Sequence, residues 1–192
     1  MNLPNTLTVI RIILAPLFFV FFFLTEWTGC CEPVSLALLI VIFAASELTD
    51  FLDGYFARKM NLVSDIGKVI DPFADVLSRM TYFFCFTISG LMPAWIFLIL
   101  IYRELGITFL RMLLIRKGIA MAASIWGKAK AVSYTAGGIL GIIYTILFRL
   151  FPGSGSLYGL NLVTRAAFIL AAGFSVLSFV KYILDASPDL RN

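Results

Sequence analysis

The chain has 192 residues, of which 61% are hydrophobic and only 14% are charged. A soluble domain carries about 25% charged residues, so the composition excludes an ordinary soluble enzyme or binding module. The net charge is +4 and there is no histidine. In a membrane protein such an excess reflects lysines and arginines in cytoplasmic loops rather than nucleic-acid binding. The three cysteines, Cys30, Cys31 and Cys85, have no spacing typical of a zinc site or a disulfide framework.

Six apolar blocks follow one another along the chain, and a membrane-spanning helix needs about 20 such residues. The first block has no cleavage site after it, so we expect it to be retained as a span. The sequence therefore predicts an all-α integral membrane protein, a single domain over residues 1–192. The six predicted transmembrane helices are Leu7–Leu24, Val34–Phe56, Asp71–Leu91, Pro93–Ile115, Ala131–Leu150 and Leu160–Leu184.

Lysine and arginine are concentrated in the second and fourth connections between these blocks. Because cytoplasmic loops are enriched in these residues, both connections and both termini are predicted to be cytoplasmic. The opening "MNLPNTLTVIR" is then a candidate for a short interfacial helix before the first span. Pro4 and Asn5 within it are typical of a helix start. The basic residues of the two connections are Arg58, Lys59, Lys68, Arg116, Lys117, Lys128 and Lys130.

Four aspartates lie between the second and third blocks, at regular spacings. Asp50 and Asp53 are three positions apart and Asp71 and Asp75 are four apart, so each pair shares one helix face. The short connection should bring all four together. Clustered carboxylates at membrane depth repel one another and are costly to desolvate. One or two divalent cations would remove that cost, and oxygen ligands suit Mg²⁺, Mn²⁺ or Ca²⁺.

The alternative interpretation is that these aspartates are solvated loop acids beside lysines. The apolar run "VLSRMTYFFCF" that follows Asp75 argues against it. Gly54 and Gly67 would permit close approach of a ligand to the backbone, or they are simple packing contacts. The planar guanidinium of Arg58 suits a phosphate group, although an arginine at this boundary also serves to orient the chain.

The full spacing is D-x-x-D-G-x-x-A-R-x(8)-G-x(3)-D-x(3)-D, and it resembles the signature of the CDP-alcohol phosphatidyltransferase family at every position. The resemblance implies six transmembrane helices, commonly in a homodimer, and two divalent cations, Mg²⁺ or Mn²⁺, at the cytoplasmic boundary. It also implies transfer of a substituted phosphate from a CDP-linked donor to an alcohol, with release of CMP. The signature positions are Asp50, Asp53, Gly54, Ala57, Arg58, Gly67, Asp71 and Asp75.

The resemblance also implies a role for each of these residues. Asp50, Asp53, Asp71 and Asp75 would bind the metal ions. Asp75 would in addition act as the catalytic base, because the chain has no histidine to take the proton of the acceptor hydroxyl. The remaining signature residues, Gly54, Ala57, Arg58 and Gly67, would bind the CDP part of the donor.

Three longer stretches resemble bacterial phosphatidylglycerophosphate synthases, which join CDP-diacylglycerol to glycerol 3-phosphate. They are "NLPNTLTVIRI", "ARKMNLVSDIGKVIDPFAD" and "YRELGITFLRMLLIRKGIAMAASIWGKAKAV". Those synthases usually read "DPxADK" and "GKxKT", whereas this chain has Val76 and Ala131 at the final positions. The departures leave open another acceptor, such as a phosphorylated inositol, or another CDP-alcohol donor.

Basic residues of the fourth block and its following connection favour an anionic acceptor. Arg103 and Arg111 are eight positions apart, about two helical turns, and so share a face. Arg103 lies inside an apolar run, where a charge is costly unless it is paired, and its neighbour Glu104 is expected to point elsewhere. We predict that Arg103, Arg111 and Lys128 bind the acceptor phosphate. Arg116, Lys117 and Lys130 are expected mainly to orient the chain in the membrane.

A cation transporter is the alternative from a different functional class, because intramembrane carboxylates also form ion pathways. A transporter would place its charges near the bilayer midplane, whereas these cluster at one boundary beside arginines. The predicted location is therefore the inner membrane of a bacterial-type cell, with the active site at the cytoplasmic boundary. The predicted partners are CDP-diacylglycerol, glycerol 3-phosphate or a similar phosphorylated alcohol, the lipid bilayer and a second copy of the chain, with no nucleic acid.

Overall fold

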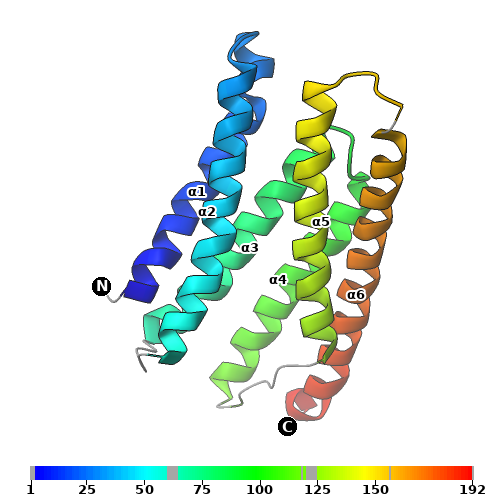
Figure 1. The fold of residues 1–192 in the computed structure, drawn as a ribbon. Coiled ribbons are helices and arrows are strands. Elements are labelled where there is room, and N and C mark those ends of the chain that lie inside the picture. Colours follow the sequence, from blue (N-terminus) through cyan, green and yellow to red (C-terminus); the bar gives the residue numbers. More distant parts are fainter. Residues whose placement is uncertain (1–2, 60–64, 118, 120–124, 156, 192) are drawn as a thin grey trace. The chain divides into compact units, whose positions relative to one another are not determined.

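The computed structural model describes residues 3–59, 65–117, 119, 125–155 and 157–191, and within the helices it leaves out the side chains at 3, 4, 51, 53–59, 65–69, 116 and 188–191. Helices account for nearly all of these ranges and no strand occurs in them, which confirms the predicted all-α class (Figure 1). The helices are α1 (Leu3–Thr28), α2 (Glu32–Lys59), α3 (Asp65–Ile88), α4 (Ala94–Arg116), α5 (Ile125–Leu150) and α6 (Leu157–Arg191).

Each predicted span corresponds to one of these helices, with ends that differ by several residues. Within the described residues, four helical stretches are long and apolar enough to cross a membrane: Asn5–Thr28, Glu32–Asp50, Ile125–Leu150 and Leu157–Ser187. The other two helices, α3 and α4, carry acidic and basic side chains along their length. The chain is thus a multi-pass membrane protein by helix length and composition, and the number of spans beyond these four stays a prediction.

The prediction of a short interfacial helix, separate from the first span, is wrong for the N-terminal residues that the structure describes. Helix α1 is continuous from Leu3 to Thr28. The sequence after Asn5 has no glycine or proline until Pro16, so no helix-breaking residue ends a first short helix. Pro4 lies in the first turn of α1, where its missing N–H costs no hydrogen bond. This confirms the prediction that Pro4 marks a helix start.

The chain divides into two compact units, Met1–Cys85 and Phe86–Asn192, here called the N-terminal and C-terminal units. In the N-terminal unit α1 packs along α2 (Figure 1). Tyr82 of α3 contacts both helices, because its ring centroid lies 4.5 Å from that of Phe18 and 5.1 Å from that of Phe43. These aromatic contacts bring the three helices of this unit together.

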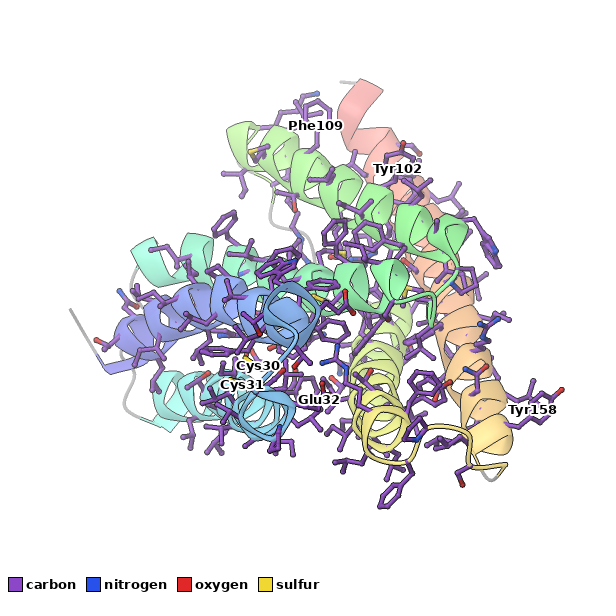
Figure 2. All side chains as sticks on the ribbon, turned by 90° about the horizontal axis from the view of Figure 1, so that it is seen from above. Cys30, Cys31, Glu32, Tyr102, Phe109 and Tyr158 are labelled. Carbon is purple, nitrogen blue, oxygen red and sulfur yellow. The ribbon has the colours of Figure 1, made fainter. Side chains whose placement is uncertain are left out.

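The turn between α1 and α2 is tight and lies at the surface. Gly29 has a φ of 68° and Cys31 a φ of 69°, both in the left-handed region that most side chains avoid. This turn carries the exposed Cys30 and Cys31 (Figure 2), both of them free thiols. Just beyond it, the hydroxyl of Ser35 donates a 2.6 Å hydrogen bond to the carbonyl of Phe21, which ties the start of α2 to α1.

In the C-terminal unit α6 packs against both α4 and α5 (Figure 1). The hydroxyl groups of Tyr134 on α5 and Ser175 on α6 lie 3.0 Å apart and both are buried. Gly141 allows a close approach, because a Cβ atom there would stand 2.5 Å from the ring of Phe86. That ring is fully buried, so it has little room to move if the glycine is replaced.

A buried network of charged groups also joins the three helices of this unit. Arg103 contacts both carboxylate oxygens of Glu104 at 3.1 Å and donates to the hydroxyl of Ser178 on α6 at 2.7 Å. Lys130 of α5 reaches the same carboxylate at 2.7 Å. The expectation that Glu104 points away from Arg103 is therefore wrong. Neighbouring helical positions do diverge, but the long arginine side chain bends back far enough to make the contact.

We expect Glu104→Gln to destabilise the protein strongly, by about 3–5 kcal/mol, because it leaves two buried cations without their shared anion. The matched control is Asp185→Asn. Asp185 also pairs with a lysine at 2.7 Å, Lys181, but both side chains are about half exposed. Exposed ion pairs contribute at most about 1 kcal/mol to the free energy of unfolding, so Asp185→Asn should change stability little. Thermal unfolding of both variants in detergent checks this, and equal midpoints would contradict a structural role for the network.

Candidate functional site

Two of the signature aspartates come together in the N-terminal unit. Asp50 lies on α2 and Asp75 on α3, and Arg11 of α1 contacts both carboxylates. One nitrogen of Arg11, Nη1, donates to Oδ1 of Asp50 and, at 3.0 Å, to Oδ1 of Asp75. A single cationic atom thus contacts two carboxylates from different helices. The predicted convergence of the two aspartate pairs is confirmed for Asp50 and Asp75.

A second arginine contacts the same two carboxylates more loosely. Arg79 lies one turn after Asp75 on α3, and its Nη2 is 3.5 Å from Oδ2 of Asp50 and 3.6 Å from Oδ1 of Asp75. These distances are at or beyond the limit of a hydrogen bond, so the attraction is mainly between charges. Together the two guanidinium groups offset the repulsion between the neighbouring carboxylates.

Asp71 has a different partner, again from α1. The hydroxyl of Thr8 donates a 2.6 Å hydrogen bond to Oδ1 of Asp71. Thr8 and Arg11 are three positions apart, so they share one face of α1, and both are buried. This face of α1 therefore contacts Asp50, Asp71 and Asp75. Sequence reasoning assigned no role to either residue, although Arg11 stands in an apolar run where an unpaired charge would be costly.

Several predicted donor-site residues lie outside the described side chains. Asp53, Gly54, Ala57 and Arg58 belong to α2, and Gly67 belongs to the first turn of α3. Their roles in binding the metal ions or the CDP group stay predictions.

The described aspartates fit a hard divalent cation by the chemistry of their ligand atoms. Carboxylate oxygens are the ligands that Mg²⁺ and Mn²⁺ prefer. Arg11 Nη1 contacts one oxygen of each of Asp50 and Asp75, so these two carboxylates already share one positively charged group. Among the residues that the structure describes, however, no three acidic, histidine or cysteine side chains are grouped as metal ligands. The structure thus brings two carboxylates together, and a four-aspartate site remains a prediction.

The predicted acceptor residues belong to the C-terminal unit. The guanidinium groups of Arg103 and Arg111 both lie 5.9 Å from the ring centroid of Tyr182, which confirms that they share a face of α4. Arg103 is buried and already paired with Glu104, whereas Arg111 and Lys128 are exposed. Lys130, expected mainly to orient the chain, has a specific partner in Glu104. That pairing crosses from α5 to α4, so sequence spacing alone could not reveal it.

The sequence profile of the CDP-alcohol phosphatidyltransferase family matches residues 1–180. Several bacterial relatives, including the three that follow, bear the name CDP-diacylglycerol–glycerol-3-phosphate 3-phosphatidyltransferase. The relative from Treponema pallidum is 33% identical over 199 residues, covering 100% of this chain and 92% of its own length. The relative from Bacillus subtilis is 37% identical over 135 residues, covering 67% of this chain and 70% of its own length. The relative from Aquifex aeolicus is 33% identical over 192 residues, covering 96% of this chain and 95% of its own length.

The profile match extends over most of the chain and includes the whole aspartate signature. The signature carboxylates of Asp50 and Asp75 also lie together against Arg11. This chain therefore belongs to the CDP-alcohol phosphatidyltransferase family.

Proposed function

We propose that the chain transfers the phosphatidyl group of CDP-diacylglycerol to glycerol 3-phosphate, giving phosphatidylglycerophosphate and CMP. The observation that carries this proposal is the complete aspartate signature within a chain that aligns over its full length with a relative of that name. Val76 and Ala131 depart from the usual pattern of those synthases. These two departures favour a second candidate function, in which the same reaction uses another phosphorylated alcohol as acceptor.

The donor site is proposed to form around the aspartates. Asp50, Asp53, Asp71 and Asp75 would hold two divalent cations, Mg²⁺ or Mn²⁺, which when bound neutralise charge on the donor pyrophosphate and the departing CMP. Gly54 and Gly67 would let the nucleotide approach the backbone, beside Ala57. Arg58 would bind a phosphate group through its planar fork of donors.

Asp75 is proposed to take the proton of the acceptor hydroxyl. The acceptor oxygen then forms a bond to the donor phosphorus, and the bond from that phosphorus to the CMP oxygen breaks. The chain contains no histidine, so a carboxylate is the available base near neutral pH. Arg79 lies 3.6 Å from Oδ1 of Asp75, and its charge would help to orient that carboxylate.

Arg111 and Lys128 are proposed to bind the acceptor phosphate directly, since both side chains are exposed. Arg103 would assist from the buried side. Its guanidinium group faces the same Tyr182 ring as that of Arg111, while Glu104 and Ser178 hold it in place. If these three cations face one acceptor, they would favour a phosphorylated alcohol over a neutral one.

The setting is proposed to be a bacterial-type inner membrane, with six spans, cytoplasmic termini and the whole chain acting as one domain. A homodimer is proposed as well, as family resemblance implies. An exposed apolar stripe on α4, which includes Tyr102 and Phe109 (Figure 2), supports it. Its three-and-four spacing is typical of helix–helix seams. The stripe consists of Trp95, Leu98, Tyr102, Leu105, Phe109 and Met112.

The activity itself is tested by CMP release from CDP-diacylglycerol with a panel of alcohols. We expect the fastest release with glycerol 3-phosphate, none in excess EDTA, and recovery when Mg²⁺ or Mn²⁺ is added back. Release with inositol phosphate alone would replace the proposed acceptor but keep the reaction class. Full activity in EDTA would contradict the metal site. Failure to bind CDP would instead favour a cation pathway.

Asp75→Asn should separate proton removal from metal binding. Asparagine keeps the shape but cannot take a proton, so turnover should fall by about 10²–10⁴-fold and stay low at every Mg²⁺ concentration. Asp50→Asn, the matched variant, should mainly weaken cation binding and recover part of its rate as Mg²⁺ rises. Rates measured against Mg²⁺ for both variants decide this. Recovery of Asp75→Asn to the same extent would make Asp75 a metal ligand first.

Arg111→Ala should raise the Michaelis constant for glycerol 3-phosphate far more than that for CDP-diacylglycerol. Losing one charge-assisted contact to phosphate corresponds to roughly 10- to 150-fold. Lys117→Ala, which removes a charge after the end of the same helix, serves as control and should leave both constants nearly unchanged. If only the donor constant moves, Arg111 belongs to the donor site.

A further inference from the structure

Among the charged side chains that the structure describes near the candidate site, Arg11 is the most deeply buried. It is 2% exposed, whereas the side chains of Asp50 and Asp75 are 36% and 39% exposed. Burying a guanidinium group in an apolar helix is costly unless acids compensate it. Arg11 therefore depends on the two carboxylates, and they in turn are drawn toward α1.

The geometry at Nη1 limits what else these carboxylates can bind. That one nitrogen contacts Oδ1 of Asp50 and Oδ1 of Asp75. A divalent cation shared by the same two oxygens would need the same position, and it would also repel the guanidinium charge. Arg79 contacts the pair at 3.5 Å and 3.6 Å, so it competes less directly. By contrast, Thr8 presents a neutral hydroxyl to Asp71, which opposes no cation.

We propose that Arg11 is an internal counter-ion that competes with a divalent cation for Asp50 and Asp75. The guanidinium group neutralises the two carboxylates when no cation is bound, and it must withdraw from their shared position when one binds. Arg11 thus lowers the cation affinity of the site while it stabilises the protein without cation. The inference rests on the metal-binding part of the proposed function.

The direction in which cation affinity changes when Arg11 is removed distinguishes competition from a role in orienting the aspartates. If Arg11 only oriented the aspartates, removing it would loosen them and weaken cation binding. If it competes, removing it relieves both the occupied position and the charge repulsion, so cation binding becomes tighter. In the same variant the carboxylates lose their counter-charge, and stability without cation should fall.

The experiment titrates purified full-length protein in detergent with Mn²⁺ and measures free Mn²⁺ by electron paramagnetic resonance. We expect the Kd for Mn²⁺ of Arg11→Gln to be roughly 10- to 150-fold below that of the unmodified protein, the range for a lost charge-assisted contact. Its thermal unfolding midpoint without Mn²⁺ should be lower, and the difference should shrink at saturating Mn²⁺. Neither readout requires turnover.

Two controls match the change in charge and in local contacts. Lys181→Gln removes one positive charge from an exposed pair with Asp185 and should leave the Kd unchanged. Thr8→Val removes a neutral contact on the same face of α1 and should not tighten Mn²⁺ binding. If Arg11→Gln does not fold, Arg79→Gln provides the same test, with a smaller decrease in Kd because its contacts are longer.

An unchanged or higher Kd in the arginine variants would overturn the inference, provided that the unmodified protein binds Mn²⁺. The proposed activity would then stand, with Arg11 as a supporting residue. No Mn²⁺ binding by the unmodified protein or by any variant would overturn the metal-dependent part of the proposed function, and this inference with it. If Lys181→Gln decreased the Kd for Mn²⁺ as much as Arg11→Gln does, the effect would be a general one of net charge. That result would also overturn the inference.

Discussion

The cost of placing charged groups among apolar helices governs both units of this protein. A chain with so few charged residues still buries Arg11 in one unit and Arg103 with Glu104 in the other. Each of these groups has an opposite charge within contact distance. In such surroundings an unpaired charge would cost several kcal/mol, which is a large part of the stability of an ordinary domain. Ion pairing therefore constrains how the helices of each unit pack.

Helix α1 illustrates how this constraint connects packing to chemistry. Its face with Thr8 and Arg11 points at the aspartates, and farther along Phe18 packs on Tyr82 of α3. The aromatic contacts hold α1 beside α2 and α3, and the polar contacts set which side of α1 faces the acids. A largely apolar membrane helix thus contributes to the core of the unit and, through Arg11, supplies a cation in contact with the aspartates.

The sequence predicted the features that depend on local spacing. The apolar blocks indicated the helices, and the four-residue spacing of Asp71 and Asp75 agrees with the contacts that both make to α1. It missed the partners that come from other helices: Arg11 for Asp50 and Asp75, and Lys130 for Glu104. Those pairings join residues 26 to 64 positions apart, and no local rule specifies them. The misjudged contact between Arg103 and Glu104 arose because backbone direction was considered without side-chain length.

The two charged clusters differ in a way that suits them to different tasks. The side chain of Glu104 is 7% exposed, and its partners Arg103 and Lys130 are 6% and 13% exposed. Such a cluster cannot readily exchange a partner with solvent, so it holds α4, α5 and α6 in place. The carboxylates of Asp50 and Asp75 are more than a third exposed, although their partner Arg11 is almost completely buried. These carboxylates are therefore more accessible than that of Glu104. A partly exposed cluster can exchange a partner directly, whereas a buried cluster exchanges one only when the surrounding helices open locally.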